Sequence, residues 1–353
     1  MSKTTALRER FARVAESVAT PLVPRDYLDL LVPLGNPEQL RGRIEAIHPE
    51  TKDAVTLEIR PGRGWQPHVP GQYIRIGVDV DGVRLWRAYS LTSGPRTDGR
   101  VCVTVKAIED GVVSNHLVRN ARPGTVIQLD QATGDFTLPE RQPRKVLFVT
   151  AGSGITPVMG MLRNHELDDV VLVHAAPSKH DVIFGGELRL LAKAGRLTLV
   201  ENHDDKHGFL TAQRLVELVP DLVDRETWAC GPIGLLDVIE HLYADKGIED
   251  QLHTERFRPV VIVAGDGGTV TFDKTGTSTE VDGGTTLLAA GEDAGVLMPS
   301  GCRMGVCFGC VLPLKEGAVR DLRNGAITTA VEGDNVKIQT CISTAAGPCH
   351  LDI

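Results

Sequence analysis

The chain has 353 residues, 42% of them hydrophobic and 24% charged, a composition typical of a globular protein with two or three domains. No apolar run is long enough to cross a bilayer, and charged residues interrupt the N-terminal segment where a signal peptide would be apolar. The sequence therefore predicts a cytoplasmic protein, and a net charge of −8 argues against nucleic acid as a partner.

Residues 1–38 are predicted to form an N-terminal helical arm. Apolar residues recur there at helical spacing and two prolines end the pattern: Leu7, Phe11, Val14, Ala15, Val18, Pro21 and Pro24. Two interpretations stay open for this arm. It packs across its own protein, or it docks on a partner or on a membrane surface.

Residues 39–140 change to short alternating runs separated by glycine and proline. Examples lie at 54–59, 72–76, 100–105 and 125–129. Such spacing predicts a small antiparallel β-barrel.

From 143 to 257 the pattern changes to buried apolar strands that alternate with helices. Strands are expected at 146–150, 170–174, 198–200 and 227–230, with helices between them. This alternation predicts a doubly wound, parallel α/β domain.

Residues 258–268, with one proline and three closely spaced glycines, are predicted to be a linker. A third domain, 269–353, should contain strands at 270–272 and 277–281 and a helix at 286–294. From Val260 onward, 11 acidic residues oppose 6 basic ones. An acidic domain suits an electron carrier that docks on a basic surface, although the same charge also keeps a small domain in solution.

The third domain carries the most specific motif of the chain. Cys302, Cys307 and Cys310 are spaced C-x4-C-x2-C, and Cys341 follows far along the sequence. This is the plant-type spacing of a [2Fe–2S] cluster. A structural zinc site is the alternative, but zinc ligands usually come as two paired hairpins.

Five motifs together resemble the ferredoxin–NADP⁺ reductase family fused to a plant-type ferredoxin. They are Arg87-x-Tyr89-Ser90, Gly111-x-x-Ser114, Gly152-Ser153-Gly154-Ile155-Thr156-Pro157, Cys230-Gly231-Pro232 and the four cysteines. The resemblance covers residues 40–353. It implies a multidomain protein with a flavin-binding barrel, a nicotinamide-binding α/β domain and an α+β, β-grasp-like ferredoxin domain.

The resemblance also implies roles for individual residues. Arg87 is suited to the flavin diphosphate, Tyr89 to stacking on the ring, and Ser90 to a hydrogen bond near the nitrogen that receives the hydride. The segment from Gly111 to Ser114 favours FAD over FMN because it would offer backbone N–H groups to the diphosphate. Phe257 would cover the flavin.

For the nucleotide, the glycine loop would bind phosphate at a helix start. Ser90, Thr156 and Cys230 are assigned to the hydride-transfer site. The alternative for Cys230 is a small core residue without a role in the reaction. The remaining residues that the resemblance assigns to cofactors are Leu91, Lys106, Val112, Val113, Ser153, Gly231 and Pro232.

The nicotinamide is expected to be NADPH, with NADH as the alternative. Ser178 and Lys179 follow the second strand of the α/β domain, where an NAD site usually has an acid, and the first acid is Asp181. A surface lysine and a turn serine would have the same sequence.

The predicted function is electron transfer from NAD(P)H through FAD to the cluster, and from there to an oxygenase, hydroxylase or fatty-acyl desaturase. A membrane-bound partner of this kind would hold the protein at a membrane surface. The alternative is a redox-sensing or zinc-binding protein without turnover.

Overall fold

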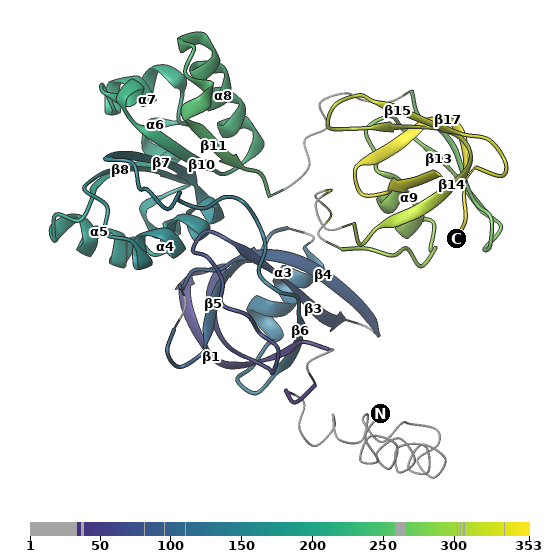
Figure 1. The fold of residues 1–353 in the computed structure, drawn as a ribbon, viewed down its shortest axis with the longest axis horizontal. Helices are drawn as coiled ribbons and strands as arrows, with labels where there is room; N and C mark the ends of the chain where they lie inside the picture. The colour runs from purple at the N-terminus through teal and green to yellow at the C-terminus, as the bar shows by residue number, and fades with distance from the viewer. Residues whose placement is uncertain are drawn as a thin grey trace, which may run out of the picture.

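The computed structural model describes residues 34–36, 39–80, 82–94, 96–109, 111–257, 266–301, 303, 305, 308–334 and 336–353 (Figure 1). The predicted N-terminal arm lies outside these residues except for its last few positions. Among the described helices, none combines the length and the apolar character needed to cross a bilayer.

The first domain is the expected antiparallel barrel. Its sheet has the order β4-β3-β6-β1-β2-β5, and a bridge between Leu91 and Val103 brings the two edges together. Alternating apolar side chains such as Ile44, Leu57 and Ile76 fill its core. The strands are β1 (Arg41–Thr51), β2 (Ala54–Pro61), β3 (Tyr73–Val80), β4 (Val83–Ser90), β5 (Val101–Lys106) and β6 (Val126–Leu129).

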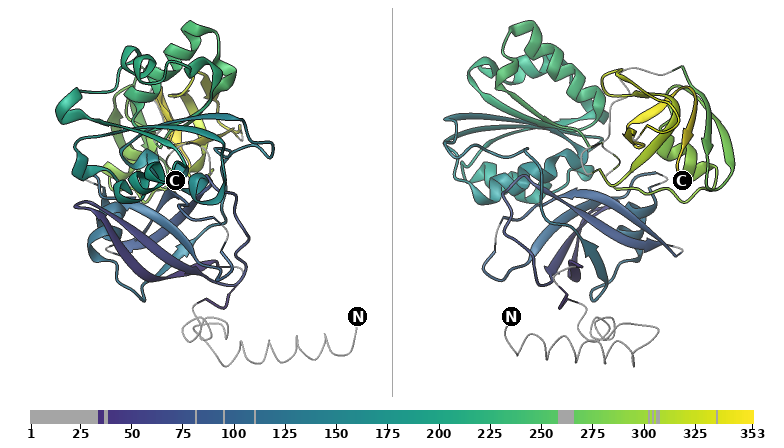
Figure 2. Two further views of the ribbon diagram at one scale, coloured as in Figure 1. Left: turned by 90° about the vertical axis from the view of Figure 1, so that its left-hand side faces the viewer. Right: turned by 45° about the vertical axis from the view of Figure 1, so that its right-hand side comes forward.

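The second domain is a parallel sheet of order β11-β10-β7-β8-β9 with helices on both faces (Figure 2). Its strands are β7 (Lys145–Ala151), β8 (Asp169–Ala176), β9 (Thr198–His203), β10 (Glu226–Cys230) and β11 (Leu252–Glu255). One face packs on α4 (Ile155–Asn164) and α5 (Gly185–Lys193), and the other on α7 (Ala212–Leu218) and α8 (Ile233–Lys246). The doubly wound prediction is confirmed.

The third domain is a mixed sheet of order β13-β12-β17-β14-β15, with β16 also paired to β14 and one helix packed in its core. Its elements are β12 (Gly268–Phe272), β13 (Thr277–Val281), α9 (Leu287–Asp293), β14 (Val311–Asp321), β15 (Ile327–Ala330), β16 (Val336–Gln339) and β17 (Ser343–Leu351). The linker prediction extended too far, because Gly268 already belongs to β12 and Gly267 bridges to Ala346.

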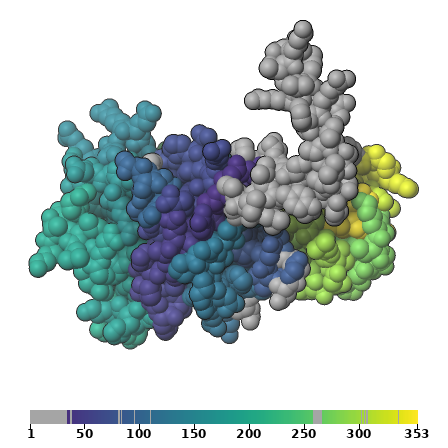
Figure 3. Space-filling model, turned by 90° about the horizontal axis from the view of Figure 1, so that it is seen from below, coloured from purple at the N-terminus to yellow at the C-terminus, as the bar shows by residue number. Residues whose placement is uncertain are grey.

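The barrel and the α/β domain pack directly against each other. Trp228 Nε1 donates to the carbonyl of Thr137 at 3.2 Å, and Lys52 forms an ion pair with Asp181 at 3.1 Å. Figure 3 shows the purple and blue barrel between the teal α/β domain and the yellow-green third domain.

Candidate active site

The α/β sheet has a single reversal of strand order, between β7 and β10. The chain runs outward from β7 through β8 to β9, then returns to β10 on the other side. Ligands of open α/β sheets bind at such a point, beyond the carboxyl ends of the strands. The glycine loop follows β7 and Cys230 ends β10, so both predicted motifs meet there.

The two loops touch. A Cβ atom on Gly154 would lie 2.0 Å from the carbonyl oxygen of Cys230, so only glycine fits. Gly152 has a φ of +53°, in the left-handed region that favours glycine, and a Cβ there would meet nothing within 4 Å. Gly154 is therefore required for packing against Cys230. The backbone at Gly152 is open, which leaves room for a ligand.

One row of side chains crosses the sheet near its carboxyl edge. Strand register pairs its members as direct neighbours, and neighbours in a parallel sheet face the same side. At about 4.8 Å per strand, the row spans on the order of 20 Å. From edge to edge it consists of Glu255, Cys230, Thr150, His174 and Glu201.

One end of this row is mostly apolar, and its last member, Glu255, is partly exposed. Cys230 is fully buried, and burial raises the pKa of its thiol well above the usual range, so the thiol stays protonated. Burial also raises the pKa of Glu255 to about 8. Its Oε2 atom is buried and has no hydrogen-bond partner among the described residues. The raised pKa favours the protonated carboxyl group, which can donate a hydrogen bond.

Thr156 stands beside this end, buried in the first turn of α4. Its hydroxyl donates to the carbonyl of Ser153 at 2.8 Å, which fixes the glycine loop from within. Phe257 packs on the same apolar cluster as Cys230. Gly231 and Pro232 lead from Cys230 into α8, and Pro232 is the residue before its first turn.

The middle of the row is polar but uncharged. Thr150 Oγ1 and His174 Nδ1 are 2.8 Å apart, and both residues are fully buried. Burial lowers the pKa of His174 to about 4, so the imidazole is neutral. Its Nε2 atom has no hydrogen-bond partner in the described part of the chain.

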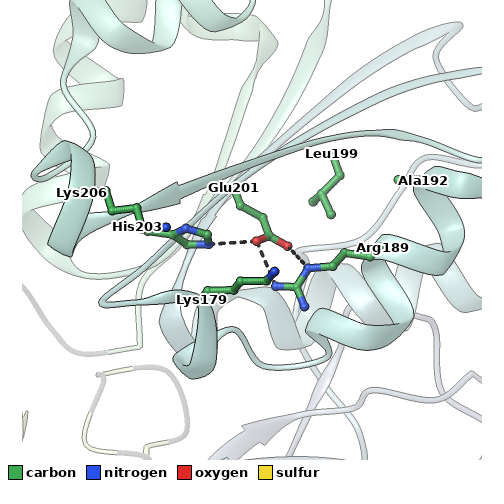
Figure 4. Close-up of a pocket in the computed structure, with 7 residues that line it drawn as sticks. All are labelled: Lys179, Arg189, Ala192, Leu199, Glu201, His203 and Lys206. Carbon is green, nitrogen blue, oxygen red and sulfur yellow. Dashed lines mark hydrogen bonds and ion pairs between the residues drawn. The ribbon is translucent and has the colours of Figure 1, made fainter.

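The other end of the row opens into a basic pocket of about 500 Å³ (Figure 4). Glu201 lies at its centre and accepts hydrogen bonds from Arg189 at 2.8 and 3.0 Å and from His203 at 2.9 Å. The backbone N–H of Asp205 donates to the carbonyl of Pro177, which fastens α6 (Asp204–His207) to the loop after β8. The pocket is lined by Lys179, Arg189, Ala192, Leu199, Glu201, His203 and Lys206.

Ser178 forms hydrogen bonds within its own turn. Its hydroxyl donates to Asp181 at 2.6 Å and accepts from the backbone N–H of His180 at 3.2 Å. The hydrogen bond from Ser178 and, after it, the ion pair with Lys52 hold the pKa of Asp181 below its usual range. Lys179 faces the pocket, whereas the hydroxyl of Ser178 is used within its own turn.

In the barrel, the R-x-Y-S motif occupies β4, an edge strand of its sheet. Arg87 is half-buried and donates to the carbonyl of Trp86 at 2.7 Å. Tyr89 packs on the barrel core, where burial raises the pKa of its hydroxyl. Ser90 is 3% exposed and its Oγ has no hydrogen-bond partner among the described residues. A buried hydroxyl in this state fits a ligand that supplies the missing partner.

The second flavin motif starts a helix, as expected. Gly111 caps α3 (Val112–Asn115), within which Val113 is buried and Val112 is about half exposed. Ser114 is buried, and its hydroxyl donates to the carbonyl of Gly111 at 3.1 Å and accepts from the N–H of Ile108. In this structure the Ser114 hydroxyl therefore stabilises the turn that precedes α3.

Lys106 and Leu91 border the same region of the barrel. Lys106 ends β5, half-buried, with Asp53 at 3.6 Å. Leu91 is fully buried and its carbonyl faces α4.

Two of the four predicted cluster ligands lie in the described part of the chain. Cys310 directly precedes β14, and Cys341 follows β16, a strand paired to β14 through Val311 and Gln339. Strand pairing thus joins residues far apart in sequence, and both cysteines are buried. Thr340 donates to the carbonyl of Cys310 through its N–H at 3.2 Å and its hydroxyl at 2.9 Å.

The cluster loop also needs glycine. Gly305 has a φ of +76°, and a Cβ there would lie 2.8 Å from Ile342 and 2.9 Å from Arg323. Cys302 and Cys307 lie outside the described residues. The donor set that is described, buried cysteines beside left-handed glycine, fits an iron–sulfur cluster.

Sequence reasoning missed most of the basic pocket and one residue between domains. Arg189, His203 and Lys206 come from three elements that only the fold brings together. The sequence signal for this pocket was Lys206, a cation that follows the predicted strand at 198–200. Arg163, which ends α4 and donates to the carbonyl of Thr92 in the barrel, gave no signal.

Comparison with known proteins agrees with this architecture. Residues 66–138 match the oxidoreductase FAD-binding domain family, and residues 270–346 match the 2Fe-2S iron-sulfur cluster binding domain family. An NADPH oxidoreductase of Mycobacterium tuberculosis is 47% identical over 97% of this chain and 91% of its own. The ferredoxin reductase component of the 3-ketosteroid-9-alpha-monooxygenase of Mycolicibacterium smegmatis is 33% identical over 81% and 89%.

Among solved structures, phthalate dioxygenase reductase superposes with a TM-score of 0.62. That match covers 90% of this chain and all of the other, at 22% identity, and supports the fold. The chain is thus an oxidoreductase that joins an FAD domain to a [2Fe–2S] domain. It belongs to the family of pyridine-nucleotide-dependent reductases in which a ferredoxin–NADP⁺ reductase-type flavoprotein is fused to a plant-type ferredoxin domain.

Proposed function

We propose that this reductase takes electrons from NADPH and delivers them to a terminal oxygenase component. A bound flavin converts the two-electron hydride of the nucleotide into the single electrons that an iron–sulfur cluster accepts. The chain contributes position and dryness. Ser90 and Thr156 would flank the site of hydride transfer, with Cys230 and Glu255 forming its floor.

The choice of NADPH rests on the basic pocket. Lys179, Arg189 and Lys206 carry three positive charges against the single carboxylate of Glu201. Lys and Arg are the usual partners of phosphate, and the 2′-phosphate is what distinguishes NADPH from NADH. The pocket also lies at the end of the row opposite Cys230, as the adenosine end of a dinucleotide requires.

Kinetics with both nucleotides test this choice. Wild-type protein should have a higher kcat/KM for NADPH than for NADH. Lys206→Gln should lower kcat/KM for NADPH about 10-fold, since a hydrogen bond to a charged group contributes about 1.5–3 kcal/mol, and leave NADH within twofold. Lys193→Gln, an exposed lysine of α5 outside the pocket, is the matched control. Equal or better kcat/KM with NADH in the wild type would overturn the choice.

The acceptor proposal rests on relatives and on charge. Several relatives are reductase components of monooxygenases, including a glycine betaine monooxygenase reductase subunit of Pseudomonas aeruginosa. In the third domain, five basic side chains already form ion pairs with acids: Lys274, Arg303, Lys315, Arg320 and Arg323. With 11 acids against 6 bases from Val260 onward, the domain keeps a negative net charge, so we infer that its surface suits a basic partner. A hydroxylase or desaturase at a membrane would use the same surface.

Salt dependence measures the contribution of this surface. Cytochrome c, a basic one-electron acceptor, serves as the probe. Its reduction by NADPH-loaded protein should slow at least several-fold between about 20 and 300 mM salt, because screening shortens the reach of charge to roughly one Debye length. A rate independent of salt would contradict the docking proposal. Cytoplasmic location is part of the proposal, supported by the free, buried thiols of Cys102, Cys230 and Cys349.

A further inference from the structure

Helix α4 connects the nucleotide loop to the flavin-binding barrel. It begins directly after Gly152–Gly154 and is buried along most of its length. Its apolar side chains belong to a core cluster that also includes Ala54, Phe136 and Leu138 of the barrel. The helix is therefore shared between the two domains that must act on each other during hydride transfer.

The last turn of α4 holds the barrel through Arg163. Its Nη1 donates to the carbonyl of Thr92 at 2.8 Å, while Nε donates to Glu187 of α5 at 2.9 Å. The guanidinium lies 4.8 Å from the ring centre of Phe184. Phe184 itself has a left-handed φ of 58° and is buried. The planar guanidinium is thus fixed on three sides, which orients its bond to Thr92.

The middle of α4 contacts the barrel at Leu91, the residue before Thr92. A Cβ on Gly160 would lie 2.5 Å from the carbonyl oxygen of Leu91. Only glycine allows this approach. Leu91 directly follows Ser90, so the contact lies one residue from a side chain of the proposed hydride-transfer site.

Every residue from Leu91 to Ser93 is fixed through its backbone. The N–H of Leu91 donates to Gln72 at 2.9 Å, and that of Thr92 donates to Cys102 at 2.8 Å. His68 Nε2 lies 2.6 Å from the carbonyl of Ser93. By contrast, the buried hydroxyls of Ser90 and Thr92 have no partner among the described residues. The backbone is rigid and the two hydroxyls remain available for a ligand.

We propose that Arg163 is a positioning residue for hydride transfer, acting through the carbonyl of Thr92. Together with Gly160 it fixes the segment that carries Ser90 at a set distance from the glycine loop, which lies at the other end of the same helix. The proposal rests on the reduction of the flavin by a pyridine nucleotide. Arg163 would then influence flavin reduction although it is not among the residues assigned to either cofactor.

Removing the donor is the first test. In Arg163→Gln, flavin reduction by NADPH in anaerobic stopped flow should slow about 10- to 100-fold per bound FAD, because a misplacement of about 1 Å costs on the order of 100-fold. The Kd for NADP⁺ should stay within about threefold. Hydrogen exchange at residues 91–93 should accelerate. Arg214→Gln, an exposed arginine of α7 paired with Glu217, is the matched control and should change none of these.

A second variant adds a steric clash between α4 and the barrel instead of removing a hydrogen bond. Gly160→Ala raises the helix propensity of α4 while forcing the helix away from Leu91. It should also slow flavin reduction at least 10-fold, with FAD content and thermal midpoint retained. Gly186→Ala on α5, where a Cβ would meet nothing within 4 Å, is its control.

Rates per FAD within twofold of wild type in both variants would overturn the proposal. If Arg163→Gln does not fold, Arg163→Lys replaces it, because lysine keeps the positive charge beside Glu187 but not the planar, fixed donor to Thr92. A rate per FAD within twofold of wild type in that variant would overturn the proposal. A purely structural role would lower FAD content or melting temperature and leave the rate of the FAD-loaded fraction unchanged. Failure of the underlying function looks different, since the wild type itself would then not be reduced by either nucleotide.

Discussion

The two ends of the nucleotide site are built in opposite ways. Around Cys230 and Glu255 the site is apolar and largely buried, and burial raises the pKa values of both groups. Around Lys179 and Lys206 it is open and charged. Both ends lie on one row of one sheet, so their separation is fixed by strand spacing.

The difference separates two tasks. A buried, dry site strengthens the interactions made during the reaction and therefore bears on kcat. An open, basic pocket meets a phosphate that does not change during the reaction, so it contributes uniform binding and bears on KM. Substitutions at the buried end should alter the rate of flavin reduction, and substitutions at the open end should alter nucleotide affinity.

The largest effect is expected at Gly154. In Gly154→Ala the new Cβ would lie 2.0 Å from the carbonyl of Cys230, so the glycine loop or the end of β10 must move. We predict that flavin reduction by NADPH slows more than 100-fold while FAD and iron content stay at wild-type levels. Gly234→Ala on α8 has no atom within 4 Å of its new methyl group and serves as control. A rate within threefold of wild type would show that the contact of the two loops has no bearing on the reaction.

An intermediate effect should appear in the pH dependence of stability. The pKa of Glu255 rises from 4.5 to about 8 on folding, so the folded state holds a proton that the unfolded state releases between these values. Stability should therefore fall as pH rises from about 4.5 to 8, by at most about 5 kcal/mol. Glu255→Gln should have the thermal midpoint of wild type near pH 5 and exceed it increasingly towards pH 8. A difference that does not change with pH would refute a protonated Glu255.

The smallest effect is expected at Ser178. Because its hydroxyl already donates to Asp181, Ser178→Ala should change kcat/KM for NADPH less than threefold. Lys179→Gln, one residue further, should lower the same quantity about 10-fold. Comparing the two variants shows whether the charge of Lys179 or the hydroxyl of Ser178 contributes to NADPH binding. A larger loss in Ser178→Ala than in Lys179→Gln would reverse the assignment.

Motifs confined to one loop were predictable, and sites assembled from several elements were not. The C-x4-C-x2-C spacing and the glycine loop after β7 carry their chemistry within a few residues. The pocket around Glu201 could not be found in the same way, because Arg189 of α5 and Lys206 of α6 meet only through the pairing of β8 and β9.

Local sequence also leaves open how a side chain with two available uses is engaged. Ser178 and Ser114 were assigned to cofactors, Ser178 with a turn residue as the alternative, and in the structure both hydroxyls bond within their own turns. Strand positions were predicted well because burial imposes a pattern on the sequence. The four strands after the cysteine loop were not predicted, because glycine and proline interrupt the alternation in β14 and β17.

The central claim is that electrons pass from NADPH through the flavin to the cluster, and an anaerobic titration tests it most directly. Wild-type protein titrated with NADPH should lose both flavin and cluster absorbance and develop the electron spin resonance signal of a reduced [2Fe–2S] cluster. Cys341→Ser should keep the flavin bleaching and lose the cluster signal. Absence of bleaching with either NADPH or NADH in the wild type, or a single zinc ion in place of iron, would contradict the account.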